Sequence, residues 1–193
     1  MARISLLLGL LFTHLFTLAQ NNLTAGAQLL FKNVNCRLSS AQKNEIFNQT
    51  GFLLSANKQQ FIQDKEGADF PFDALVLPTD LNKDGKEEIF IVFGNLYTSG
   101  NTGSSVLLFI QNSNGQYQPN LGFPGTMPDV LATSHNGYPD LLIGGPGFEY
   151  PIWRWNGKAY QLHKSINDHS LNAIKKTNLE SISKAYTSSL RNQ

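Results

Sequence analysis

The middle of the chain contains two copies of one sequence pattern, and this internal repeat limits the fold more than any other feature. Residues 80–88 align without a gap to residues 132–140, so that Gly85 falls on Gly137. In both copies an apolar run follows directly, which is typical of a buried strand. Repeats of roughly 50 residues are typical of propeller blades or of similar stacked sheet units.

Each copy continues in the same order through a glycine-rich connection, a second strand and a tight turn. The turns contain Asn114-Gly115 and Asn156-Gly157, and Asn-Gly pairs favour hairpins because both residues tolerate positive φ. A tyrosine follows each turn, Tyr117 in the first copy and Tyr160 in the second. The two predicted repeats cover residues 73–118 and 125–163.

The loop of the first copy has the composition of a cation site. Oxygen-bearing side chains occupy its positions 1, 3, 5 and 9: Asp80, Asn82, Asp84 and Glu88. Gly85 permits a sharp turn at position 6. An EF-hand would need a bidentate Glu at position 12 on a helix, where this chain has Ile91 inside an apolar strand. The alternative is a turn rich in Asn, Asp and Gly that needs no metal.

This loop, followed by an apolar strand, resembles the calcium loop of FG-GAP and VCBS repeats, the blades of integrin-α-like propellers. The resemblance implies that Asp80, Asn82, Asp84 and Glu88 bind a structural Ca²⁺, with the backbone carbonyl of Lys86. The second copy has Ala132 and Ser134 at positions 1 and 3. We therefore expect the second copy to have lost the ion.

Two copies are too few for a closed propeller, which needs about four blades. We expect one domain over residues 20–193, a β-dominated α+β fold with two blade-like antiparallel repeats. A short N-terminal helix should begin near Ser39 and end before Gly51. Apolar residues at helical spacing predict a C-terminal helix over residues 168–190, packed across an open sheet edge.

Residues 1–19 have the pattern of a secretory signal peptide, with Arg3 before a short apolar stretch and Ala19 at the expected cleavage site. The chain has 15 basic side chains, of which Arg3 lies in this leader, so 14 remain against 14 acidic ones. A neutral chain without basic clusters argues against binding nucleic acid. We expect a secreted or periplasmic protein without a transmembrane anchor after cleavage.

Candidate binding residues lie in the long connections and on one strand. Tyr97 and Asn101 belong to a hydroxyl-rich loop, and Glu149 belongs to the equivalent connection of the second copy. Loops on a rigid scaffold often carry binding functions, although these could also be plain connections. Trp153 and Trp155 alternate along a strand, where core packing is the simpler role and a sugar-stacking platform the alternative.

Enzymatic signatures are missing from the sequence. It contains no Gly-x-Ser-x-Gly, no phosphate-binding glycine motif and no His-Glu-x-x-His. The sequence favours a non-enzymatic binding module stabilised by calcium, with an extracellular glycan or protein as its ligand. The alternative is a small glycosidase-like extracytoplasmic hydrolase using Asp129, Asp140 or Glu149, or an inhibitor of such an enzyme.

Overall fold

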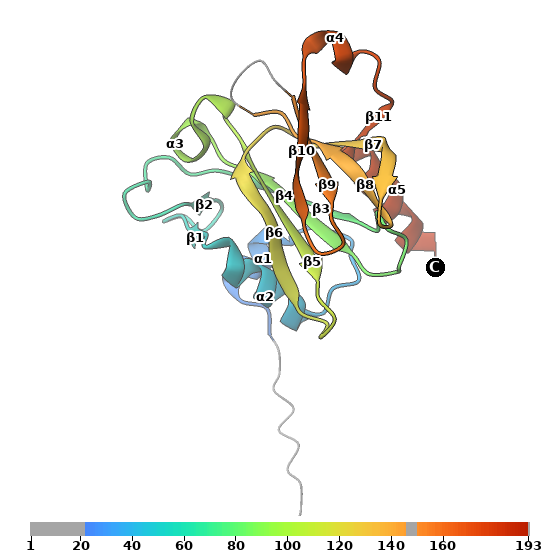
Figure 1. The fold of residues 1–193 in the computed structure, drawn as a ribbon. Helices are drawn as coiled ribbons and strands as arrows, with labels where there is room; N and C mark the ends of the chain where they lie inside the picture. Colours follow the sequence, from blue (N-terminus) through green and yellow to red (C-terminus); the bar gives the residue numbers. More distant parts are fainter. Residues whose placement is uncertain (1–21, 146–149, 193) are drawn as a thin grey trace, which may run out of the picture.

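The structure is a computed structural model that describes residues 22–145 and 150–192. It is dominated by two antiparallel sheets with short helices before and after them (Figure 1). The described strands form no closed barrel, because each sheet has two free ends in its strand order. The expected class, a β-dominated α+β fold with two blade-like repeats, is confirmed.

The first sheet is a four-stranded meander made by repeat 1. Its strands follow in chain order, β3 (Ala74–Thr79), β4 (Glu88–Phe93), β5 (Ser105–Gln111) and β6 (Tyr117–Pro124). The connection from β4 to β5 contains a one-turn helix α3 (Leu96–Ser99) and a 3₁₀ turn η1 (Gly100–Thr102).

The second sheet repeats this meander. Its strands are β7 (Asp129–His135), β8 (Tyr138–Leu142), β9 (Tyr150–Trp155) and β10 (Tyr160–Ile166). A short strand from the C-terminal region, β11 (Lys176–Asn178), adds a fifth position beside β7. The edge of β7 is therefore paired in this repeat, whereas β3 at the same place in repeat 1 is the end of its sheet.

The two closing tyrosines have matching positions in the two repeats. Tyr117 donates its hydroxyl hydrogen bond to the backbone carbonyl of Glu87 at 3.0 Å, and Tyr160 donates to that of Pro139 at 2.9 Å. Glu87 and Pro139 both hold position 8 in the aligned loops. The same long-range contact thus occurs twice, as expected for two copies of one structural unit.

The first sheet is the central layer of the molecule. Side chains alternate across a strand, so Ile89 and Ile91 face one side of β4 while Phe90 faces the other, and all three are fully buried. Ile89 and Ile91 pack against the N-terminal region. Phe90 packs in a second core with Leu141 of the second sheet. Burial on both faces explains why β4 is apolar almost throughout.

The N-terminal region covers the first sheet with helices α1 (Ala25–Leu30) and α2 (Ser40–Thr50) and the small hairpin β1 (Leu53–Leu54) and β2 (Phe61–Ile62). Ser39 caps α2 in a capping box with Gln42. Gly51 ends this helix in the left-handed conformation, with φ 72°. The predicted N-terminal helix is confirmed.

The predicted C-terminal helix is present, but its predicted bounds of residues 168–190 are wrong, because this region is divided. Helix α4 (Asp168–Leu171) is one turn long, β11 follows, and α5 (Leu179–Ser189) then runs into the 3₁₀ turn η2 (Leu190–Asn192). Hydrogen bonding of β11 to β7 competes with helix formation, and Asn178 then caps a new helix. Helix α5 packs against the edge strand β3. None of the helices in the described ranges has the length and apolar character needed to cross a membrane.

Candidate metal loop and neighbouring groove

The loop between β3 and β4 is folded by its own side-chain oxygens. Both carboxylate oxygens of Asp80 accept from the backbone N–H of Gly85, at 3.2 and 3.3 Å. Asn82 accepts from the N–H of Asp84 at 3.1 Å, and Asp84 accepts from the N–H of Lys86 at 2.8 Å. Gly85 has φ 82°, which explains the need for glycine there. Three predicted ligands are thus held in one tight loop.

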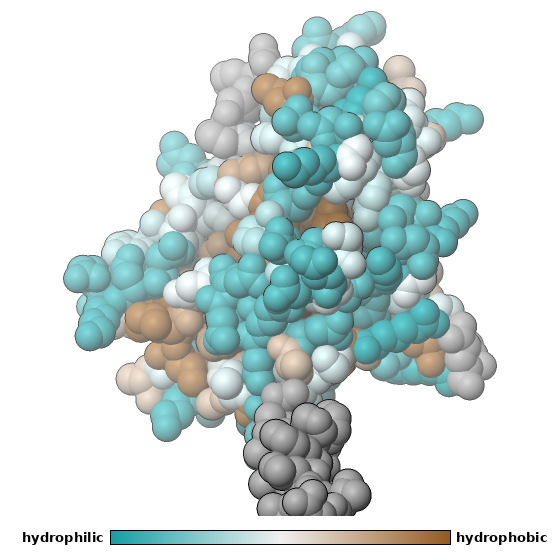
Figure 2. All heavy atoms as spheres, turned by 60° about the horizontal axis from the view of Figure 1, so that its bottom comes forward, coloured by the Kyte–Doolittle hydropathy of each residue, from teal (hydrophilic) through white to brown (hydrophobic). Residues whose placement is uncertain are grey.

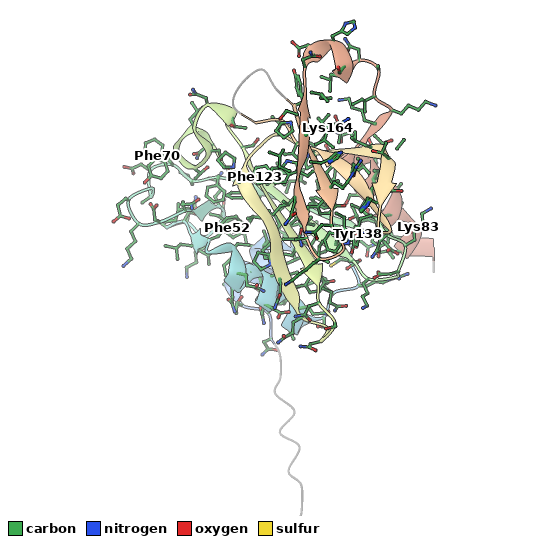
Figure 3. The ribbon with its side chains drawn as sticks, viewed as in Figure 1. Phe52, Phe70, Lys83, Phe123, Tyr138 and Lys164 are labelled. Carbon is green, nitrogen blue, oxygen red and sulfur yellow. The ribbon has the colours of Figure 1, made fainter. Side chains whose placement is uncertain are left out.

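Glu88, the fourth predicted side-chain ligand, is buried at the start of β4, with 2% of its surface exposed. Its carboxylate accepts from the N–H of Leu81 at 2.7 Å and from the hydroxyl of Tyr138 at 3.1 Å. Burial raises the pKa of Glu88 to about 7, and the negative charges of Asp80 and Asp84 act in the same direction. Figure 3 labels Tyr138 and the loop residue Lys83 on the same side of the molecule.

Glu87 is also buried but faces the other side of the sheet. It accepts from the backbone N–H of Arg37 at 2.9 and 3.0 Å and from the hydroxyl of Tyr186 on α5 at 3.2 Å. Burial raises its pKa above the ordinary value. The sequence pattern gave no role to Glu87, because its partners lie 50 and 99 positions away.

The second repeat replaces the loop with a tight turn. Residues 132–135 belong to β7, and Asn136 and Gly137 connect it directly to β8 with φ 50° and 86°. Two successive residues with positive φ are characteristic of a two-residue hairpin. The side chains at its positions 1 and 3, Ala132 and Ser134, therefore belong to a strand.

The carboxylates at position 9 also differ in their electrostatic partners. Asp140 of repeat 2 accepts from the Nε and Nη2 atoms of Arg154 at 2.9 and 2.7 Å, and from the Thr133 hydroxyl at 2.6 Å. Burial by itself would raise the pKa of Asp140, but these bonds outweigh it and hold the pKa below its usual value. In repeat 1 the residue across from Glu88 on β5 is Ile110, one step beyond the Ile89–Phe109 pair.

In the part of the chain that the structure describes, no ion pair involves a carboxylate of the first loop. The ion pairs among the described residues join Arg154 to Asp140 and Lys176 to Asp129. The oxygen-only donors of the loop are chemically suited to a hard cation such as Ca²⁺. Their arrangement is open, because the described residues contain no cluster of three or more His, Cys, Asp or Glu side chains that could hold a metal.

A groove of about 730 Å³ lies beside this loop, at the boundary of the two repeats. Asn82 and Asp84 line it from the loop, Asn120 lines it from β6, and Tyr138 and Trp155 line it from the second sheet. The groove combines carboxamides with aromatic edges. On the face shown in Figure 2 the surface is mostly hydrophilic, and its hydrophobic atoms form separate small patches.

The candidate binding residues do not form one site. Tyr97 on α3 stacks against Phe70, with ring centroids 4.9 Å apart, and Asn101 is exposed in η1. Trp153 stacks on Phe123 of the first sheet, with centroids 4.6 Å apart.

Trp155 packs with Tyr138 and Tyr160. Core packing is thus confirmed for both tryptophans, while Trp155 also lines the groove. Glu149 lies outside the described residues.

Two of the three carboxylates considered for hydrolysis, Asp129 and Asp140, are engaged in ion pairs. Asp140 is bound by Arg154, and Asp129 is bound by Lys176. A glycosidase needs one carboxyl group that can give a proton and a second that stays ionised. The described residues place no such pair in a cavity around Asp129 or Asp140.

Comparison of the chain with protein-family models, with curated proteins and with solved structures gave no match.

Proposed function

We propose that the chain is a non-enzymatic binding module whose Asp80–Glu88 loop is stabilised by Ca²⁺. The observation that carries the proposal is the difference in charge between the repeats. Repeat 2 neutralises the carboxylate of Asp140 with Arg154, whereas in repeat 1 Asp80, Asp84 and Glu88 form no ion pair with any described residue. A bound cation would supply the missing positive charge.

Asp80, Asn82 and Asp84 would hold the ion through side-chain oxygens, with the backbone carbonyl of Lys86 and the carboxylate of Glu88 completing the set. The ion would supply positive charge and oxygen coordination. Hydrogen bonds already hold three of these side chains within the loop, which reduces the entropy that binding must remove. The role of the ion is structural, because Glu88 also binds Tyr138 and so joins the loop to the second sheet.

The ligand we propose is an extracellular glycan bound in the groove beside the loop. Carboxamides such as Asn82 and Asn120 match sugar hydroxyls because each can both donate and accept. The aromatic edges of Tyr138 and Trp155 offer apolar contact. The export leader expected over residues 1–19 lies outside the described residues, and a secreted or periplasmic location is part of the proposal.

Thermal unfolding with and without calcium tests the metal site. Extracellular sites have dissociation constants on the order of 10⁻⁴ to 10⁻³ M, so 10 mM Ca²⁺ would stabilise the protein by about 1.4 to 2.7 kcal/mol. We expect the melting temperature to rise by about 3 to 10 °C over the value in EDTA. Asp80→Ala should abolish the rise, and Ser134→Ala in repeat 2 should keep it. An equal melting temperature in calcium and EDTA contradicts the metal site.

A glycan array tests the ligand separately. We expect Gln118→Ala, an exposed change in the groove, to weaken the binding of any glycan found, and the exposed control Gln63→Ala to leave it unchanged. Capture of a protein partner with no glycan bound would replace the glycan proposal and leave the metal site standing.

A further inference from the structure

The second sheet carries a cavity on the face turned away from the first sheet. This outer cavity has a volume of about 450 Å³, within the range of about 300 to 1,000 Å³ usual for small-molecule sites. Its apolar side includes Leu131 of β7 and Ile152 of β9, which are exposed by only 5% and 2%. Residues 173–175, between α4 and β11, line it from outside the sheet.

Basic side chains exceed acidic ones around the outer cavity. Arg154, Lys164 and Lys175 line it, and Asp140 is its acidic lining residue. Arg154 neutralises Asp140, whereas Lys164 and Lys175 form no ion pair within the described part of the chain. The cavity therefore has an excess of positive charge beside an apolar wall. Lys164 is labelled on β10 in Figure 3.

Arg154 is held in a fixed orientation. Asp140 is only 1% exposed and accepts from the Nε and Nη2 atoms of Arg154, while Nη1 makes no hydrogen bond to a described residue. The hydroxyl of Thr133 fixes the carboxylate in turn. A guanidinium held by a buried carboxylate is pre-organised, which lowers the entropy lost when it binds an anion.

Two irregularities in the strand pairing lie next to the cavity. The register of β7 shifts between Val130 and Ser134, and that of β10 shifts between Leu162 and Lys164. Bulges of this kind redirect side chains and are frequent near functional sites. They place Thr133 and Lys164, both cavity residues, at or beside the irregular positions.

We propose that the outer cavity binds a small amphipathic monocarboxylate. The apolar chain of the ligand lies against Leu131 and Ile152, and its carboxylate is recognised by Arg154, Lys164 and Lys175. An uncharged apolar molecule would leave the basic groups unused, and a small inorganic anion would leave the apolar wall uncovered. This site is separate from the calcium loop and does not depend on the proposed function.

Calorimetric titration with octanoate tests the proposal on the intact mature chain. We expect octanoate to bind, and 1-octanol and acetate to bind at least about tenfold more weakly, since each lacks one half of the recognised chemistry. Equal affinity for octanoate and octanol, or for octanoate and acetate, overturns the proposal. Absence of octanoate binding overturns it as well.

Substitutions of exposed lysines locate the site. Lys164→Ala and Lys175→Ala should each weaken octanoate binding by about tenfold, the factor that corresponds to one charge-assisted hydrogen bond. Lys65→Ala removes an equal charge from an exposed loop far along the chain and should leave the affinity unchanged. Melting temperatures within 2 °C of one another, roughly the effect of 0.5 kcal/mol, would show that all variants are folded. Unchanged affinity in a variant that carries both Lys164→Ala and Lys175→Ala contradicts the assignment.

Discussion

Glu87 and Glu88 are adjacent in the sequence but join different parts of the molecule. Because they stand at the start of a strand, their side chains point to opposite faces. Glu87 connects the segment at Arg37 with α5 through Tyr186, and Glu88 connects the first loop with Tyr138 of the second sheet. Buried carboxylates are stable only with such partners. These two residues therefore contribute to the assembly of the layers as well as to the loop.

Removal of the hydroxyl group of a closing tyrosine should change the free energy of unfolding by nearly the same amount in either repeat. Tyr117→Phe and Tyr160→Phe each remove a hydrogen bond to a backbone carbonyl, buried at Glu87 and half-buried at Pro139, and we expect the free energy of unfolding to fall by about 1 kcal/mol in both. Tyr97→Phe, where the hydroxyl is exposed, should stay within about 0.5 kcal/mol. Urea unfolding measures all three. A loss confined to one repeat would contradict the equivalence of the two contacts.

The ion pair of Asp140 with Arg154 predicts how the stability of the fold depends on pH. The pKa of Asp140 is lower in the folded chain than in the unfolded chain, so its contribution is complete above the unfolded pKa and disappears as the pH falls through the folded value. We expect Asp140→Asn to lower the free energy of unfolding at pH 7, because it removes the charge that pairs with Arg154. The difference between wild type and variant should shrink below about pH 4. A difference that stays constant down to pH 3 would contradict this.

At the scale of single elements, the N-cap residues of the two C-terminal helices, α4 and α5, should differ in their effect on stability. Asn178 caps α5, which buries Leu179 and Ser183, whereas Asn167 caps α4, which buries no residue. We expect Asn178→Ala to lower the free energy of unfolding by about 1 kcal/mol and Asn167→Ala to lower it by less than about 0.5 kcal/mol. Equal losses in urea unfolding would show that α4 is as firmly packed as α5.

Elements defined by local chemistry could be predicted from the sequence. The cap at Ser39, the end at Gly51 and the two Asn-Gly turns depend on residues a few positions apart, and each appears where it was expected, although only the glycine of each Asn-Gly pair has positive φ. The C-terminal region was mispredicted because the helical spacing of its apolar residues continues across Lys176–Asn178. Only the free edge of β7, more than 40 positions earlier, selects a strand for this segment.

The residues of the candidate metal loop could be predicted from the sequence, but the side chains that surround them could not. The spacing of Asp80, Asn82 and Asp84 identified the loop, and the alignment of the repeats identified Asp140 as the counterpart of Glu88. The strand register places Arg154 beside Asp140 in repeat 2 and Ile110 at the same place in repeat 1. This register could not be predicted from residue spacing, because it depends on the whole sheet. The outer cavity likewise requires four strands and a returning C-terminal segment.

At the scale of the whole molecule, the two repeats share one core. Val106 of the first sheet is fully buried in the cluster that also contains Tyr138, Leu141 and Trp155 of the second sheet. An isolated four-stranded repeat would expose this face to water, at a cost of roughly 25 cal/mol for each Å² of apolar surface. The repeats should therefore unfold together, although each is a complete meander in its strand order.

A substitution in repeat 1 that is followed through repeat 2 tests this coupling. Both tryptophans of the chain, Trp153 and Trp155, lie in β9, so their fluorescence reports on the second sheet and on the contact of Trp153 with Phe123 of the first sheet. Val106→Ala removes two buried carbon atoms from the first sheet and should lower the free energy of unfolding by about 2 kcal/mol. The urea midpoint should then fall by about 1 M, equally by tryptophan fluorescence and by far-UV circular dichroism.

Leu96→Ala is the matched control for this experiment, because 74% of the surface of Leu96 is exposed, and its midpoint should remain near that of the wild type. A fluorescence midpoint that stays at the wild-type value while the dichroism midpoint falls would mean that the repeats unfold as separate units. The shared core between the sheets predicts that the fluorescence and dichroism midpoints fall together. Val106, Tyr138 and Trp155 belong to one buried cluster, so one transition should report both sheets.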